Sequence, residues 1–318
     1  MTSQEFSEEK KNRKNFLLKL SGTVIAFTVI VFLIWKNWTG FLDALNSLSV
    51  SYLLLVLLLA FFSRLFVTVR WMILLSVIEP QVTFFEIAKL SFVGLFTTNV
   101  LPSTIGGDVV KFGGAVQAGY DPAGVTASLV IDRLVGMITM ATFLPISIIQ
   151  VAQVNPYRTL AAFSMPGTFL HNLWEKLAKF LNKTGHYLKV WLKQPKHLIL
   201  VSLFSYLHMA CTFTMVTVIL FQLDDPITFW NAGGLWVLVY FITLIPVSIN
   251  GLGLQEVSMS IIFITFAGIT ESNSLVLALL MRVAFIISSL PGAFFLPGVM
   301  SGRREQKLST IQDRLPNE

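Results

Sequence analysis

The sequence predicts an all-α, polytopic integral membrane protein with about eight helical segments. Of its 318 residues, 54% are hydrophobic and only 13% are charged, and the mean hydropathy is +0.73. Soluble chains carry about 25% charged residues, so the composition argues against a disordered chain, a disulfide scaffold or a nucleic-acid-binding domain. The net charge of +6 lies beside apolar stretches, which suits the inner face of a membrane. One cysteine, Cys211, excludes an intramolecular disulfide.

The apolar stretches define the expected spans, because a bilayer core of about 30 Å needs about 20 apolar residues in a helix. The first stretch, 16–35, follows a basic cluster but is too long for a signal peptide, so we expect an uncleaved span. The other candidates are 50–71, 83–101, 123–151, 198–221, 229–249, 257–267 and 274–299. The segment 257–267 is short, and either a full crossing or a re-entrant arm fits it.

Basic residues near the span ends predict the orientation. Of the 23 Lys and Arg residues, 15 lie in three segments, namely 1–15, 155–196 and 301–318. We therefore expect a transmembrane domain over 16–300, cytoplasmic tails over 1–15 and 301–318, and a cytoplasmic loop over 155–196. That loop is amphipathic, with Trp191 among its aromatic residues, and an interfacial linker is preferred to a lipid-headgroup site. The expected location is the cell membrane, with both termini cytoplasmic.

Two segments share one pattern and predict an internal repeat. Segments 99–109 and 244–257 each contain an apolar helix, a proline, a glycine-rich break and an acid followed by valine. With span 83–101 running outward and span 229–249 running inward, the two units would be inverted repeats. Helices broken at matching positions indicate a transporter binding site that lines a shared cavity. The predicted hinge residues are Pro102, Gly106, Gly107, Pro246, Gly251 and Gly253.

Two arginines inside apolar segments are the main candidates for binding. Arg133 and Arg282 lie about ten residues into their spans, where an unpaired charge is costly. A guanidinium suits a phosphate, and we expect each arginine to reach a carboxylate when no ligand is bound. The candidate substrate-binding residues are Asn99, Asp108, Lys111, Asp132, Arg133, Asn250, Glu256 and Arg282. A purely structural salt-bridge role for the arginines and their acids stays open.

The remaining charges and motifs receive structural interpretations. Glu86 and Lys89 are spaced to pair on one helix, and Arg64 and Arg70 are placed to extend toward the interface. The histidines lack metal-ligand spacing, and neither a phosphate-binding loop nor a nucleophile motif is present. We therefore expect no metal, no cofactor and no catalytic residue.

Several motifs together resemble the flippase-like family of the lysylphosphatidylglycerol synthase transmembrane domain. These motifs are Asn99-Val-Leu-Pro-Ser-Thr-Ile-Gly-Gly-Asp108, Ile131-Asp-Arg133, Asn250-Gly-Leu-Gly-Leu-Gln-Glu256 and Leu290-Pro-Gly292. The resemblance runs from the first span to about residue 299 and implies a domain that moves a charged lipid between leaflets. Lys111 stands where many relatives have arginine. In the best-known relatives an aminoacyl-transferase domain follows; only an 18-residue tail follows here, so we expect no aminoacyl-lipid synthesis.

The leading hypothesis is translocation of an anionic or phosphate-bearing lipid, either a phospholipid or a polyprenyl-phosphate-linked lipid. The expected partners are membrane lipids with anionic headgroups and enzymes of envelope-lipid or glycan biosynthesis, and not nucleic acid. Some relatives are associated with glycan assembly, so a membrane glycosyltransferase or glycan-assembly accessory is the alternative. That activity needs outer carboxylates, for which Asp43 and the pair Asp224 and Asp225 are the candidates. A non-transporting scaffold is the third reading.

Overall fold

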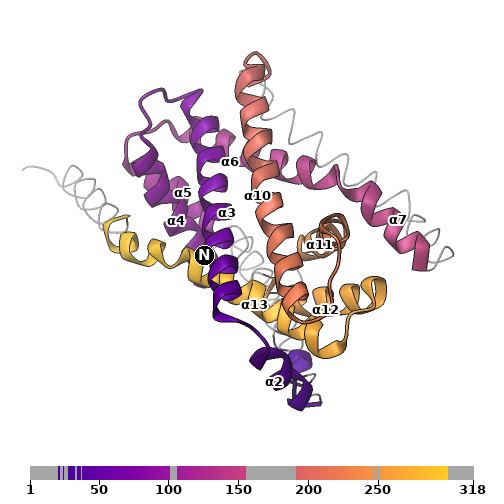
Figure 1. The fold of residues 1–318 in the computed structure, drawn as a ribbon. Helices are drawn as coiled ribbons and strands as arrows, with labels where there is room; N and C mark the ends of the chain where they lie inside the picture. The colour runs from indigo at the N-terminus through magenta and orange to yellow at the C-terminus, as the bar shows by residue number, and fades with distance from the viewer. Residues whose placement is uncertain are drawn as a thin grey trace, which may run out of the picture.

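The computed structural model describes residues 21, 24, 28–32, 34–36, 38–100, 106–154, 191–245, 248 and 251–299. The regular elements in these ranges are helices, arranged as one bundle (Figure 1). In chain order they are α2 (Trp38–Asn46), α3 (Val50–Ser76), α4 (Phe84–Val100), α5 (Gly106–Gln117), α6 (Pro122–Ala141), α7 (Leu144–Val154), α10 (Pro195–Gln222), α11 (Phe229–Thr243), α12 (Leu254–Ala267) and α13 (Glu271–Ser289).

Four of these helices are long and apolar enough to cross a bilayer. They are α3, α6, α10 and α13, which have 27, 20, 28 and 19 residues. A fifth crossing is possible at the start of the described chain, where the helix Thr28–Lys36 meets α2 at an angle of 85°. The protein is therefore an integral membrane protein, with four or five candidate spans in its described part. The other apolar helices, Leu144–Val154, Phe229–Thr243 and Leu254–Ala267, are shorter, with 11, 15 and 14 residues.

The helices form two series of four with the same order of lengths. The first series is α3 to α6 and the second is α10 to α13; in each, two short helices lie between two long ones. The short helices have 17 and 12 residues in the first series and 15 and 14 in the second. Within each series, successive helices pack together and the last packs back on the first. In addition, α3 packs against α13, and α10 packs against α6.

The two long helices α3 and α10 run antiparallel at the centre of the bundle (Figure 1). The backbone N–H of Ser49, just before α3, donates to Gln222 Oε1 at the end of α10 (3.1 Å). Farther along, Ser63 Oγ lies 2.7 Å from His208 Nδ1. Nearer the other end, Arg70 donates to Ser205 Oγ at 3.3 Å. The register is continuous, so the first helices of the two series point in opposite directions.

Helices α4 and α5 form a tightly packed antiparallel hairpin. A Cβ on Gly94 would lie 2.6 Å from Lys111 Cγ, and one on Gly107 would lie 2.0 Å from Thr98 Oγ1. The open end of the hairpin is closed where the backbone N–H of Asp121 donates to Glu79 Oε1 (2.9 Å). The segments that precede α4 and follow α5 therefore meet at one end of the hairpin. The sequence did not predict α5, because its four glycines and two charges interrupt the apolar pattern.

The glycine contact predicts a specific loss of stability. Gly107→Ala should lower the free energy of unfolding by about 1–3 kcal/mol, because the added methyl group overlaps Thr98 Oγ1 and the Gly94 carbonyl oxygen. The measurement is thermal unfolding of the purified protein in detergent. Gly298→Ala is the matched control, since its Cβ would meet nothing within 4 Å. Equal melting temperatures for the two variants would contradict this packing.

Three expected spans break or end earlier than predicted, two of them at prolines. Stretch 123–151 is divided into α6 and α7, since Pro145 lacks an N–H and its ring excludes a continuous helix. Stretch 274–299 ends as α13 at Ser289, two residues before Pro291, and a separate helical run covers 291–299. Stretch 229–249 likewise forms a helix only as far as Thr243. Most of span 16–35 lies outside the described residues.

The position of Trp191 differs from the interfacial one expected for the 155–196 loop. Its side chain is buried, and its indole N–H donates to the carbonyl oxygen of Leu74 on α3 (3.0 Å). It therefore anchors the start of α10 to the end of α3 and does not lie in the lipid interface. Residues 155–190 are outside the described chain, and the side of the membrane on which they lie stays a prediction.

Candidate functional site

Two arginine–carboxylate pairs occupy the same positions in the two helix series. Asp108 and Glu256 are each the third residue of a short helix, α5 and α12, where the helix dipole favours a negative charge. Arg133 and Arg282 are each the twelfth residue of a long helix, α6 and α13. The Nε–H of Arg133 donates to Asp108 Oδ2, and that of Arg282 donates to Glu256 Oε1. The predicted pairing of each arginine with a carboxylate is confirmed.

The pair in the second series is deeply buried. The side chains of Arg282 and Glu256 are 13% and 5% exposed. Arg282 Nη2 also donates to the Gly251 carbonyl oxygen (3.2 Å), and Glu256 Oε2 accepts from the Gly253 N–H (2.7 Å). Both glycines have positive φ, +68° and +78°, which a residue with a side chain rarely adopts. This glycine turn therefore holds both members of the pair through its backbone.

The pair in the first series is more open. The side chains of Arg133 and Asp108 are 46% and 23% exposed. Gly106 begins α5 and is buried, whereas Gly107 serves the close contact with α4. Asn99 Nδ2 donates to Ser289 Oγ (2.9 Å) and so joins α4 to the end of α13. The remaining predicted site and hinge residues, Pro102, Pro246 and Asn250, lie outside the described residues.

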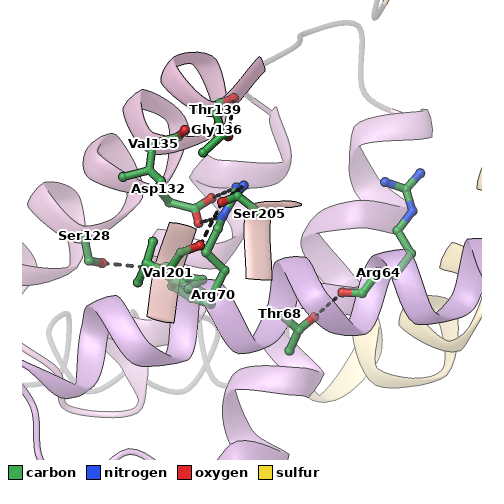
Figure 2. Close-up of polar contacts among 11 residues, drawn as sticks. Arg64, Thr68, Arg70, Ser128, Asp132, Val135, Gly136, Thr139, Val201 and Ser205 are labelled. Carbon is green, nitrogen blue, oxygen red and sulfur yellow. Dashed lines mark hydrogen bonds and ion pairs between the residues drawn. The ribbon is translucent and has the colours of Figure 1, made fainter. Parts of the chain in front are cut away.

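Asp132 has a different partner from those considered in the sequence. It accepts two hydrogen bonds from Arg70, from Nε to Oδ1 at 2.6 Å and from Nη2 to Oδ2 at 2.8 Å (Figure 2). Arg70 also donates to Ser205 of α10, so one guanidinium joins α3, α6 and α10. Both side chains are only 9% exposed. The expectation that Arg70 extends toward the interface is therefore wrong, because a buried carboxylate binds its guanidinium inside the bundle.

Lys111 is a buried cation without a carboxylate of its own. It is 6% exposed, and among the described residues its ammonium makes neither an ion pair nor a hydrogen bond. Nζ lies 5.1 Å from the centre of the Trp71 ring, a cation–π distance. The Trp71 indole is in turn held by Ser128 Oγ (3.2 Å). Lys111 is thus positioned by packing against Gly94 and by an aromatic face.

Two buried charged residues of the first series, Lys111 and Asp132, have apolar counterparts in the second series. At the positions equivalent to Lys111 and Asp132, the second series has Met259 and Met281, and both are fully buried. Two charges in one half thus correspond to two thioethers in the other. The two series share their arginine–carboxylate pairs but differ in the interior that surrounds those pairs.

Other charges that the sequence singled out have structural partners. Glu86 accepts a hydrogen bond from the Tyr120 hydroxyl, and Lys89 Nζ lies 4.4 Å from the centre of the Phe85 ring. The expected Glu86–Lys89 pair is not formed. Both residues line a pocket of about 510 Å³ between the α4–α5 hairpin and the helical run 291–299. Burial and the hydrogen bond to Glu86 raise the pKa of Tyr120, which keeps its hydroxyl protonated as a donor.

The three acids considered for glycosyl transfer, Asp43, Asp224 and Asp225, have different surroundings. Asp225 Oδ2 accepts from Asn273 Nδ2 (2.7 Å) and from the N–H and hydroxyl of Thr270, and so joins the end of α10 to the start of α13. Asp224 is adjacent in the turn, and Asp43 lies exposed on α2. Within the described ranges, no group of three His, Cys, Asp or Glu residues could hold a metal ion.

Comparison with known proteins gives two matches. A family model described as the lysylphosphatidylglycerol synthase TM region matches residues 20–292. A UPF0104 membrane protein of Pyrococcus horikoshii is 24% identical over 138 residues, which is 42% of this chain. That alignment covers 41% of the relative, so the chain spans less than half the length of the curated protein it matches.

Proposed function

Because the chain belongs to the family of the lysylphosphatidylglycerol synthase TM region, we propose that it moves an anionic, phosphate-bearing lipid between the leaflets of the cell membrane. The substrate class comprises phospholipids and polyprenyl-phosphate-linked lipids. The observation that carries the proposal is the repeated arginine–carboxylate pair. A lipid phosphate can replace the carboxylate at either arginine, because both are acceptors for the same planar set of donors.

We further propose that the two series are inverted repeats, in which each pair of long helices flanks a re-entrant hairpin. The antiparallel α3 and α10 and the matched positions of the ion pairs support this arrangement. In an inverted pair, the two hairpins enter from opposite sides and place their acids toward the middle of the membrane. The headgroup would pass between these positions while the acyl or prenyl chains stay in lipid. We also propose that both termini lie in the cytoplasm.

The test is transport by the purified full-length chain in phosphatidylcholine vesicles. Fluorescent phosphatidylglycerol in the inner leaflet should become accessible to an impermeant quencher faster than in protein-free vesicles. A parallel set of vesicles receives a polyprenyl-phosphate sugar and an acceptor glycan. Sugar transfer to the acceptor without any lipid movement would replace this proposal with the glycosyltransferase reading.

Arg133→Lys should leave translocation partly active. The lysine keeps the positive charge opposite Asp108 but loses the planar fork of donors, so a phosphate would be held by fewer hydrogen bonds. We expect a rate between those of the wild type and protein-free vesicles in the quenching assay. Lys36→Gln is the control, because Lys36 is 56% exposed and pairs with Glu271 away from the arginines. A wild-type rate for Arg133→Lys would show that the fork is not used.

A further inference from the structure

Arg64 is a partly buried arginine whose side chain takes no part in the ion pairs described above. Its Nε atom is inaccessible to solvent and has no hydrogen-bond partner, and no carboxylate among the described residues pairs with the side chain. In Figure 2 its guanidinium points away from Asp132, and the only dashed line at this residue joins its backbone carbonyl to Thr68. Leaving such a group unpaired in a helix interface is costly. The unpaired Nε–H is therefore a donor that an anion would satisfy.

The guanidinium of Arg64 faces α13 near the second arginine–carboxylate pair. Its Cζ atom lies 4.4 Å from the centre of the Phe285 ring. Phe285 is three residues after Arg282, so both occupy the same face of α13. Arg64 on α3 and Arg282 on α13 thus both lie at the contact between these two helices. We call Arg64, Arg282 and Glu256 the second cluster; its two cations and one carboxylate give a formal net charge of +1.

The first cluster has the same net charge. It consists of Lys111 on α5, the Arg133–Asp108 pair that joins α6 to α5, and the Arg70–Asp132 pair that joins α3 to α6. Three cations and two carboxylates give a formal net charge of +1. In each cluster the excess charge belongs to the cation without a carboxylate, Lys111 in the first and Arg64 in the second. Helix α3 contributes to both clusters, through Arg70 toward α6 and through Arg64 toward α13.

We propose that Arg64 and Arg282 form a second phosphate-binding site, separate from the Lys111 site, and that each site accepts one phosphodiester lipid carrying a single negative charge. The inference rests on the proposed function and narrows its substrate class. A phosphodiester neutralises a cluster of charge +1, whereas a diphosphate would leave at least one uncompensated negative charge in apolar surroundings. Phospholipids and polyprenyl-phosphate monosaccharides share this diester chemistry.

The decisive variant is Arg64→Met, tested by native mass spectrometry of the full-length protein with dioleoyl phosphatidylglycerol. The wild type should bind two lipids and Arg64→Met one. Lys111→Met should also bind one, and the double variant none. Diacylglycerol, which lacks a phosphate, measures nonspecific binding, and Lys36→Gln should keep both lipids. If the protein's lipid is a polyprenyl-phosphate sugar, two molecules of it should also bind to each wild-type protein. A polyprenyl diphosphate should bind at least tenfold more weakly.

A second readout separates binding from a structural role. Because methionine fills similar space without a charge, Arg64→Met should raise the melting temperature of the lipid-free protein. A lower melting temperature together with two bound lipids would show that Arg64 is structural. One bound lipid in the wild type, or tighter binding of the diphosphate, would also overturn the inference. The proposed function fails separately, if the wild type moves no lipid in vesicles.

Discussion

Replacing Arg282 with glutamine should reduce lipid translocation at least tenfold in the vesicle quenching assay. Hydrogen bonds to a charged group contribute about 1.5–3 kcal/mol, which corresponds to roughly 10-fold to 100-fold in an equilibrium constant. Arg282 would donate such bonds to the lipid phosphate, and glutamine offers neither the charge nor the planar fork. The variant should insert into the membrane, since it removes a charge that is costly to bury.

The partner of Arg282 requires its own control. Glu256 is 4% exposed, and without the arginine its carboxylate keeps only the Gly253 N–H as a donor. The double variant Arg282→Gln with Glu256→Gln should therefore be more stable than Arg282→Gln but equally inactive. If Arg282→Gln transports lipid at the wild-type rate while Asp43→Asn is inactive, the arginines do not bind the headgroup. The glycosyltransferase reading, which needs outer acids, would then lead.

Asp132→Asn should produce the largest loss of stability. It leaves the Arg70 guanidinium buried without its carboxylate, and breaking one side of a buried pair costs about 3–5 kcal/mol. The measurement is unfolding in detergent by titration with sodium dodecyl sulfate. The double variant Asp132→Leu with Arg70→Met removes both charges and should recover most of the lost stability. Equal stabilities for the single and double variants would contradict a buried pair at this place.

The sequence predicted contacts within each helix series at short range better than contacts between distant helices. The pairs Arg133–Asp108 and Arg282–Glu256 join residues 25 and 26 apart, and the matching motifs had already placed them together. The Arg70–Asp132 pair joins residues 62 apart and depends on how α3 packs against α6, which no local pattern encodes. The sequence also did not predict that the Arg64 side chain lies against α13, because this contact likewise joins distant helices.

The predicted helix boundaries were wrong where prolines or glycines interrupt an apolar stretch. Pro145 divides α6 from α7 inside one apolar stretch, and the proline rule would have found this division. Helix α5 escaped prediction because its glycines serve a close backbone contact rather than an apolar face. Trp191 was assigned to the lipid interface because aromatic residues gather there, but its indole is satisfied inside the protein by Leu74. A single sequence does not distinguish these two uses of tryptophan.

The second series has Met259 and Met281 at the positions equivalent to Lys111 and Asp132. This difference affects how the helices respond to small displacements. A bidentate ion pair is directional, so the Arg70–Asp132 bonds weaken steeply when α3 and α6 shift by a fraction of an ångström. Thioether contacts have little directionality, and methionine repacks among several rotamers at low cost. At these two positions, therefore, the first series is held by directional contacts and the second by contacts that adapt to small displacements. Under the proposed function, we expect small displacements during transport to be accommodated around Met259 and Met281 more easily than around the Arg70–Asp132 pair.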